Sequence, residues 1–424
     1  MKVLWLSSQP GLLDIPERRN PYNGGGWIGA LQGLLKDVKE CELAVAFPFS
    51  IKKEKIVQGG ITYYPVYTPK QSSLHKIKTY YGGYKKWARE EHVAGLQAVI
   101  ADYRPDVIHL FGIENAFANM LGRTDVPLVV HLQGFLAPYD NAFFPQGLNE
   151  GSFIWPPTLR EWVTRNGYIF AKKNIHARGL QEIERFRDVR YTMGRTAWDY
   201  EVSRLLAPES TYHVVNEVLR PAFYDHAGTW VRHDRSRFVI ISTVSQTVYK
   251  GIDLVLKAAK LLREHTDIDF EWRIVGVRDT SMYVRYFERS TGIRGADYGI
   301  RYLGIRSAEE LCADLLDGDV YVHPSYIDNS PNSVCEAQLV GLPVIGTYVG
   351  GIPSLIEHGV SDLLIPANGP FELAYHLKAL AADAEYAARL SAGGATAAAK
   401  RHDRKQIVAD LMETYKNAIE KDKE

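Results

Sequence analysis

The sequence predicts two α/β domains, each built on a parallel sheet with helices on both faces. The chain has 424 residues, which is too long for one ordinary domain and fits two units of roughly 200 residues each. Strand-like and helix-like segments alternate along most of the chain, and this order favours parallel sheets with helical crossovers. The hydrophobic content of 46% and the charged content of 24% are those of a globular protein.

The composition argues against several classes of partner and location. The formal net charge is zero, so no overall field favours nucleic acid or an anionic membrane. The three cysteines, Cys41, Cys312 and Cys335, lack metal-ligand spacing and suit a reducing compartment. The first ten residues are typical of a β-strand rather than a signal peptide, and no apolar run is long enough to span a bilayer. We therefore expect a cytoplasmic protein that binds no nucleic acid.

The first half of the chain opens with strands and a glycine-rich loop. Strands are predicted at residues 3–7, 43–47, 61–66, 106–111 and 126–132. Gly24, Gly25 and Gly26 follow the first strand and precede a helix with Ile28 and Leu31 on its apolar face. A glycine loop in this place exposes backbone amides to a ligand phosphate, although ordinary tight turns use the same residues.

Polar side chains lie where the central strands of this first sheet end. Ligands of doubly wound sheets bind at the carboxyl ends of the strands, and Gln133 follows the strand at residues 126–132. His131 is two residues earlier, so it shares a face with Gln133 one step deeper. We interpret Gln133 as a candidate ligand contact and His131 as a core histidine.

Residues 63–86 are rich in tyrosine and lysine. Aromatic and basic residues together suit a sugar acceptor or the surface of a membrane. A long surface loop would have the same composition, so both alternatives remain open. Further along, strands are predicted at residues 191–196, which include Arg195, and at residues 211–219. Residues 226–237 are polar and lack periodicity, as expected of an interdomain linker.

The second half repeats the alternation and contains the most informative stretch of the chain. Strands are predicted at residues 238–242, 270–275, 300–304, 319–323 and 343–347. Lys250 stands directly before a helix, and a second helix begins after Tyr326, with Ser330 as its expected N-cap. The amides of Asn332 and Ser333 at that helix start form a site for an anion such as phosphate.

Two acids frame this helix start. Asp328 lies in the loop ahead of the helix and Glu336 lies within it. Residues 328–353 resemble the donor-site pattern of retaining GT-B glycosyltransferases of family four, also called group 1: an acid, seven residues, a glutamate, then G-L-P-V and a Gly-Gly loop. Asp328 stands where this family usually has glutamate. Residues 193–224 are similar to a subset of the family tied to surface polysaccharide assembly.

The resemblance implies a fold and a domain division. It implies a GT-B fold, in which two Rossmann-like domains face a cleft and the last helix crosses back to the first domain. We accordingly expect an acceptor-side domain at residues 1–225 with the helix at residues 404–424, and a nucleotide-sugar-binding domain at residues 226–403.

The resemblance also implies roles for individual residues. Asp328 would bind the donor sugar, Glu336 the ribose hydroxyls and Lys250 the leaving diphosphate. The Gly24–Gly26 loop would face the same diphosphate. Gln133 aligns with a histidine of the family that touches the donor sugar, and the turn from Gly304 to Arg306 is where the family seats the base.

One expected cation is missing. The family has an arginine five residues before the lysine, and this chain has Ser245 there. The sequence offers Arg195, Arg278 and Arg306 as replacements without deciding among them. No DxD pair stands in a suitable loop, so neither a metal nor another cofactor is expected.

The implied activity is that of a retaining, hexosyl-type glycosyltransferase in polysaccharide or glycoconjugate biosynthesis. It would move a sugar from a nucleotide-diphosphate sugar, such as a UDP- or GDP-sugar, to a hydroxyl of a glycan or lipid-linked glycan. A lipid-linked acceptor would bring the protein to the inner face of the cell membrane. Two alternatives remain: a nucleotide-sugar epimerase on a similar fold, and a non-catalytic sugar-binding subunit.

Overall fold

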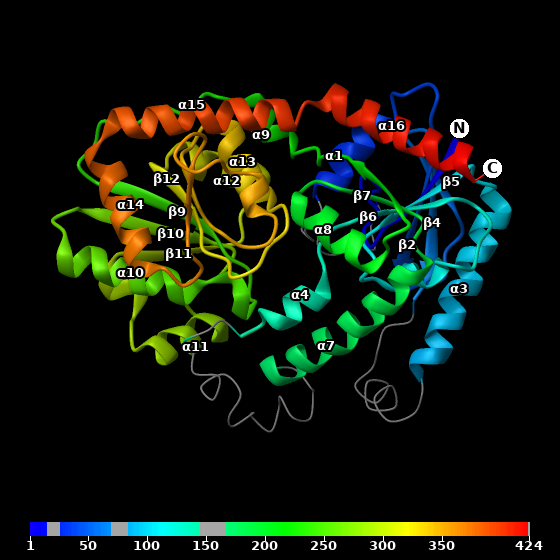
Figure 1. Cartoon of the computed structure of the whole chain (residues 1–424), viewed down its shortest axis with the longest axis horizontal. Coiled ribbons are helices and arrows are strands. Elements are labelled where there is room, and N and C mark those ends of the chain that lie inside the picture. Colours follow the sequence, from blue (N-terminus) through cyan, green and yellow to red (C-terminus); the bar gives the residue numbers. More distant parts are fainter. Residues whose placement is uncertain (15–25, 69–83, 145–146, 148–166, 423–424) are drawn as a thin grey trace.

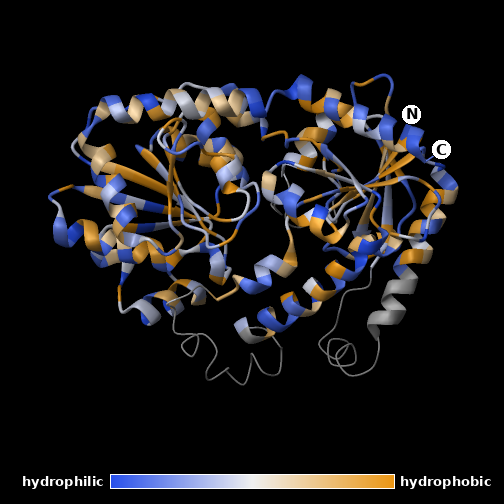
Figure 2. Cartoon of the chain, viewed as in Figure 1, coloured by the Kyte–Doolittle hydropathy of each residue, from blue (hydrophilic) through white to orange (hydrophobic). Residues whose placement is uncertain are grey.

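The computed structural model describes residues 1–14, 26–68, 84–144, 147 and 167–422. It places two parallel sheets side by side, each with helices on its faces (Figure 1). Apolar residues colour the strands between the helix layers, and polar residues colour the outer helix faces (Figure 2). Within the described residues, no helix combines the length and the apolar composition that a bilayer crossing needs.

The first sheet has the strand order β3-β4-β2-β1-β5-β6-β7-β8. All of its neighbours are parallel except β3, which is antiparallel to β4. Its strands are β1 (Lys2–Leu6), β2 (Glu42–Phe49), β3 (Ile56–Gln58), β4 (Ile61–Tyr67), β5 (Val107–Phe111), β6 (Leu128–His131), β7 (Tyr191–Gly194) and β8 (Thr211–Val214). The helices of this half are α1 (Gly26–Leu35), α3 (Tyr84–Tyr103), α4 (Leu136–Asn141), α7 (Tyr168–Arg185), α8 (Ala197–Leu206) and α9 (Pro221–Asp225).

The second sheet is parallel throughout and has the order β11-β10-β9-β12-β13-β14. Its strands are β9 (Phe238–Thr243), β10 (Phe270–Val275), β11 (Ile300–Gly304), β12 (Val320–His323), β13 (Val344–Thr347) and β14 (Leu363–Ile365). Its helices are α10 (Ile252–His265), α11 (Met282–Thr291), α12 (Ala308–Leu316), α13 (Asn332–Val340), α14 (Pro370–Ala382) and α15 (Ala384–Arg401).

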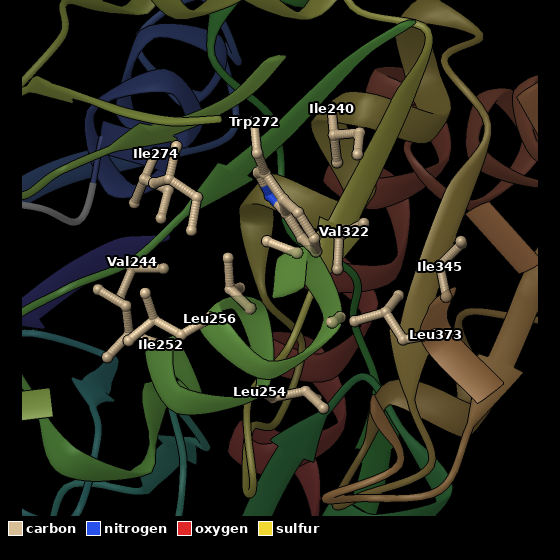
Figure 3. Packing of buried hydrophobic residues seen from close by; sticks show 14 of the residues in the cluster. Ile240, Val244, Ile252, Leu254, Leu256, Trp272, Ile274, Val322, Ile345 and Leu373 are labelled. Carbon is tan, nitrogen blue, oxygen red and sulfur yellow. The ribbon is translucent and has the colours of Figure 1, made fainter. Parts of the chain in front are cut away.

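The core of the second half packs one face of its sheet against α10 and α14. Trp272 of β10 is fully buried and lies among Ile240, Val322 and Leu256 (Figure 3). Its indole nitrogen donates to Ser242 Oγ at 3.0 Å, which satisfies the one polar group of the ring. Such close packing keeps the strand ends, and therefore the loops that follow them, in fixed positions.

The chain passes between the two halves twice. After β8 it runs through α9 to β9, and after α15 it returns as α16 (Arg404–Lys421), which lies against α1 beside the first sheet (Figure 1). The two passages contact each other, because His402 Nδ1 lies 2.9 Å from the Glu217 carbonyl oxygen and Tyr224 OH donates to the His402 carbonyl at 2.9 Å. The two crossings therefore form one bonded junction.

One predicted strand was too long, and one strand was missed. The strand predicted at residues 211–219 ends at Val214, and the residues after it are buried as part of the crossing rather than by sheet pairing. The segment predicted as a linker joins α9 to β9, and Trp230 within it is buried and donates to the Gly318 carbonyl at 2.8 Å. Strand β3 was missed because it is a three-residue edge strand without an apolar run. The Gly24–Gly25 part of the glycine loop and most of the tyrosine- and lysine-rich segment lie outside the described residues.

Candidate active site

A cleft of about 890 Å³ lies between the two halves, at the carboxyl ends of β9 and β12. The strand order of the second sheet reverses between these two strands, and such switch points are where open α/β sheets bind ligands. The residues that line the cleft and bear on its chemistry are Gly26, Trp27, Gln133, Arg195, Arg220, Ser245, Lys250, Arg306, His323, Asp328, Asn332, Ser333 and Glu336. The structure thus brings together every predicted site residue that it describes except Gly304, which directly precedes the lining residue Ile305.

A glycine fixes the position of Lys250. The short helix η3 (Val248–Lys250) follows β9, and Gly251 then takes a left-handed conformation with a φ of 72°. A Cβ at Gly251 would lie 1.9 Å from the Pro324 carbonyl oxygen, so only glycine lets this loop approach the end of β12. This approach brings Lys250 to the loop that carries Asp328.

Asp328 is the most heavily bonded carboxylate of the cleft. Its Oδ2 accepts from Lys250 Nζ at 2.5 Å and from His323 Nε2 at 2.9 Å, and its Oδ1 accepts from Tyr139 OH at 3.2 Å. Burial alone would raise the pKa of Asp328, but the Lys250 ammonium and the His323 ring hold it well below its ordinary value. The ionised carboxylate therefore positions Lys250, a role that comes in addition to the sugar contact predicted from the sequence.

Burial favours the neutral form of His323. Burial lowers its pKa, although the adjacent Asp328 opposes that shift. A neutral ring that donates from Nε2 to Asp328 has its Nδ1 available as an acceptor, and Tyr321 OH lies 3.5 Å from Nδ1. His323 therefore orients Asp328 through a hydrogen bond.

Helix α13 begins at the cleft, one residue later than predicted. Pro331 is the N-cap and makes no side-chain capping bond. Ser330 was predicted as the cap, but its hydroxyl donates to the buried Glu217 carboxylate at 2.5 Å, a charge-assisted bond that is stronger than a capping bond to an amide. The Asn332 and Ser333 amides donate to no backbone carbonyl of the described residues, so they remain available to an anion.

Glu336 meets a residue that the sequence reasoning missed. Arg220 donates two hydrogen bonds to Glu336, from Nε to Oε1 at 2.7 Å and from Nη2 to Oε2 at 2.8 Å. Burial raises the pKa of Glu336, and the guanidinium opposes this shift. A glutamate within an apolar helix face indicates that a cation must lie nearby, but only the tertiary structure identifies Arg220. The ribose contact predicted for Glu336 therefore has to share the carboxylate with this arginine.

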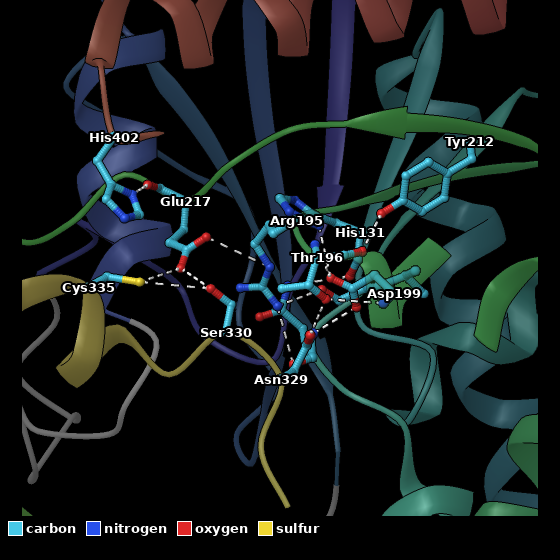
Figure 4. Close-up of polar contacts among 12 residues, drawn as sticks. His131, Arg195, Thr196, Asp199, Tyr212, Glu217, Asn329, Ser330, Cys335 and His402 are labelled. Carbon is cyan, nitrogen blue, oxygen red and sulfur yellow. Dashed lines mark hydrogen bonds and ion pairs between the residues drawn. The ribbon is translucent and has the colours of Figure 1, made fainter. Parts of the chain in front are cut away.

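The first half of the chain holds the Asp328 loop through a buried polar network (Figure 4). Thr196 Oγ1 donates to Asn329 Oδ1 at 3.0 Å, and Asn329 Nδ2 donates to Asp199 Oδ1 at 2.7 Å. Arg195 donates to the carbonyls of Leu132 and Gln133. Since the bonds of Asn329 with Thr196 and Asp199 join the two halves next to Asp328, they hold this loop against the first half.

The remaining candidate residues differ in their relation to the cleft. Ser245 lines it, is exposed and brings no charge; its hydroxyl lies 3.1 Å from the Thr247 hydroxyl. Arg306 lines the cleft but pairs with Asp314 at 3.1 Å. Arg278 is absent from the lining. Gln133 lines the cleft, and its side chain donates to the His131 carbonyl at 3.3 Å.

Among the described residues, one group has metal-ligand atoms close together: Glu217, Cys335 and His402, within 4.8 Å of one another. All three are buried at the junction of the two halves (Figure 4). Glu217 already accepts from Ser330 and from Cys335, and Arg195 Nε lies 3.8 Å from its other oxygen. A guanidinium beside the carboxylate disfavours a second cation, so this group is a structural cluster.

Two family models match the chain. Residues 235–383 match the model described as glycosyl transferases group 1, and residues 58–172 match the glycosyl transferase 4-like domain. The amylovoran biosynthesis glycosyltransferase AmsK of Erwinia amylovora is 27% identical over 185 residues, which are 42% of this chain and 44% of that protein. The chain therefore matches less than half the length of this curated relative.

Solved structures share the fold over nearly the whole chain. Sucrose-phosphate synthase from Thermosynechococcus elongatus superimposes with a TM-score of 0.69 at 13% identity and covers 98% of both chains. The Anabaena protein HepE, solved with UDP-glucose, gives a TM-score of 0.64 at 17% identity and covers 98% of this chain and 100% of that one. These likenesses confirm the predicted GT-B fold. The two family matches, at residues 58–172 and 235–383, show that the chain belongs to the group 1 glycosyltransferases.

Proposed function

We propose that this protein transfers a sugar from a nucleotide-diphosphate sugar to a hydroxyl of a glycan or lipid-linked glycan. The observation that carries the proposal is the convergence of Lys250, Asp328 and the first amides of α13 on one wall of the cleft. Family membership and the relative named for amylovoran biosynthesis support a role in polysaccharide or glycoconjugate assembly. HepE, a structural neighbour, was solved with UDP-glucose, which makes a UDP-sugar the first donor to test.

The residues fit the chemistry of such a transfer. When the bond between the anomeric carbon and the diphosphate oxygen breaks, the electron pair stays on the diphosphate, and stabilising that charge is the main catalytic task. Lys250, Asn332 and Ser333 line the cleft where this charge would develop, so the ammonium and the helix-start amides would stabilise it. Retention of the anomeric configuration and independence from metal belong to the same proposal. The resemblance supports the first, and the lack of a DxD pair in a suitable loop supports the second.

The test measures release of nucleotide as a function of acceptor. A thermal-shift screen with UDP, GDP, ADP and CMP selects the base, and the matching sugar nucleotide is then incubated with and without lipid-linked and free glycans, in EDTA or in magnesium. We expect release that requires an acceptor, equal rates in EDTA and magnesium, and a product whose anomeric NMR signal matches the donor. Release without any acceptor would instead favour an epimerase, and binding without release under every condition would favour a non-catalytic subunit.

A further inference from the structure

The cleft contains two cation–acid pairs that flank the start of α13. One is Lys250 with Asp328, and the other is Arg220 with Glu336. The two cations have similar exposure, since 20% of the Lys250 side chain and 18% of the Arg220 side chain are accessible, whereas Glu336 is 1% accessible. Arg220 therefore lines the cleft with a partly accessible side chain while it pairs with a buried carboxylate.

Glu336, Phe223 and Gly26 are among the neighbours that hold the Arg220 side chain in place. Glu336 binds it on one edge at 2.7 and 2.8 Å, and the ring of Phe223 lies 4.8 Å from its Cζ. Its aliphatic stem runs against Gly26, where an added Cβ would lie 3.0 Å from Arg220 Cδ. Arg220 thus lies between Gly26, at the start of α1, and Glu336 of α13.

The other arginines of the described lining are less suited to a ligand phosphate. Arg195 has only 3% of its side chain accessible and donates to the carbonyls of Leu132 and Gln133. Arg306 is 29% accessible but pairs with Asp314, on the side of the cleft that follows β11. Ser245 contributes no charge at the loop beside Lys250. Of the lining arginines, Arg220 is the one that pairs with a side chain of α13 itself.

We propose that Arg220 is a diphosphate-binding residue and supplies the second positive charge at the leaving group, a charge that Ser245 cannot supply. A guanidinium has five N–H donors in a planar fork, so it serves Glu336 on one edge and a phosphate oxygen on another. This inference rests on the proposed function, because it needs a nucleotide diphosphate in the cleft. It places the second charge on the segment that joins the two halves, rather than on the loop after β9.

The test separates a contact with the diphosphate from a purely structural role for Arg220. Calorimetry measures the binding of a nucleoside diphosphate and of the matching monophosphate to the wild type, Arg220→Lys and Arg220→Ala. The pair is UDP and UMP, or the corresponding pair if the screen selects another base. UDP and UMP share the ribose that Glu336 would bind and differ in the second phosphate. If Arg220 binds the diphosphate, Arg220→Ala weakens UDP roughly tenfold to a hundredfold and UMP much less, because a charge-assisted bond to phosphate is lost.

Two further variants keep the test decisive. Arg220→Ala leaves the buried Glu336 carboxylate without its arginine. The double variant Arg220→Ala/Glu336→Gln removes that buried charge, and its nucleotide affinities are compared with those of Glu336→Gln alone. Adding Ser245→Arg to Arg220→Ala should restore part of the UDP affinity. Arg237, which is exposed and pairs with Asp269 outside the cleft, provides the control Arg237→Ala, for which we expect unchanged binding of both nucleotides.

The outcomes distinguish the two levels of the argument. Equal weakening of UDP and UMP by Arg220→Ala would show that Arg220 only holds Glu336 in place, and the inference would fail while the proposed function stands. Unchanged UDP affinity in all Arg220 variants would also overturn the inference that Arg220 binds the diphosphate. A wild type that binds none of the four screened nucleotides would overturn the proposed function itself.

Discussion

The two walls of the cleft are built in different ways. The wall on the second half comes from the ends of β9 and β12 and from α13, and its acids and helix amides lie within residues 328–336. The wall on the first half is assembled from single residues far apart in the sequence, among them Trp27, Gln133 and Arg195. A wall made by one local motif can be recognised in a sequence, whereas a wall made by tertiary packing requires the structure.

The largest effect is expected from removing Lys250, which belongs to the wall on the second half. Lys250→Ala should lower turnover by a factor of about 10²–10³, because an electrostatic donor at the leaving group is lost. Lys250→Arg should restore only part of it, since a planar fork does not replace a point charge. Steady-state rates of nucleotide release with saturating acceptor measure the effect.

The chain offers a matched control for this variant. Lys257 pairs with the fully buried Asp253 at 3.0 Å and has 28% of its side chain accessible, as part of α10 and outside the cleft lining. Lys257→Ala should lower the melting temperature and leave the turnover of the folded protein unchanged. If Lys250→Ala kept most of its activity, the diphosphate would have to lie elsewhere. The wall on the second half would then not be the diphosphate-binding wall.

A second experiment addresses the first-half wall through pH. Glu182 of α7 is buried and accepts from the Ala137 amide at 3.1 Å, at the start of the helix whose Tyr139 reaches Asp328. Burial raises the pKa of Glu182 from 4.5 to about 7. Because the folded-state pKa is higher, the folded state prefers the neutral acid, and its stability falls as pH rises from about 4.5 through 7.

Glu182→Gln should remove this loss of folding stability at high pH. The variant should match the wild type near pH 4.5 and exceed it by up to about 3 kcal/mol above pH 7.5, at 1.36 kcal/mol per pKa unit. Chemical denaturation at several pH values measures the difference, and Glu184→Gln, an exposed position of the same helix, is the control. A difference that does not change with pH would mean that Glu182 ionises normally.

The smallest effect is expected at Gln133. The side chain lines the cleft and cannot serve as an acid or base, so we expect it to act as a hydrogen-bonding contact. Gln133→His should change the transfer rate by no more than roughly threefold, less than the value of one neutral hydrogen bond. Complete inactivation of a folded Gln133→His would show that the aligned histidine position lies elsewhere.

The features that the sequence predicts are those made by local motifs, and the features that it does not predict are those made by tertiary packing. The strand and helix order of the second half and the start of α13 to within one residue follow from local patterns. The resemblance to the family, rather than any local pattern, predicted that Lys250, Asp328 and Glu336 share one site. Arg220 could not be found in this way, because its importance comes from a carboxylate 116 residues away. The same holds for Tyr139 and His323, whose roles depend on contacts with Asp328 that no spacing in the sequence reveals.

The return of α16 to the first sheet has a consequence for how the protein is made. Trp5 Nε1 donates to Tyr415 OH at 3.1 Å, across a sequence separation of 410 residues, and Tyr415 and Leu411 pack against the same face of the sheet as Val3. During synthesis the ribosome therefore releases the first strand long before the helix that covers it. The first domain to emerge is the last to be completed, and until then its apolar face is open to chaperones and to aggregation.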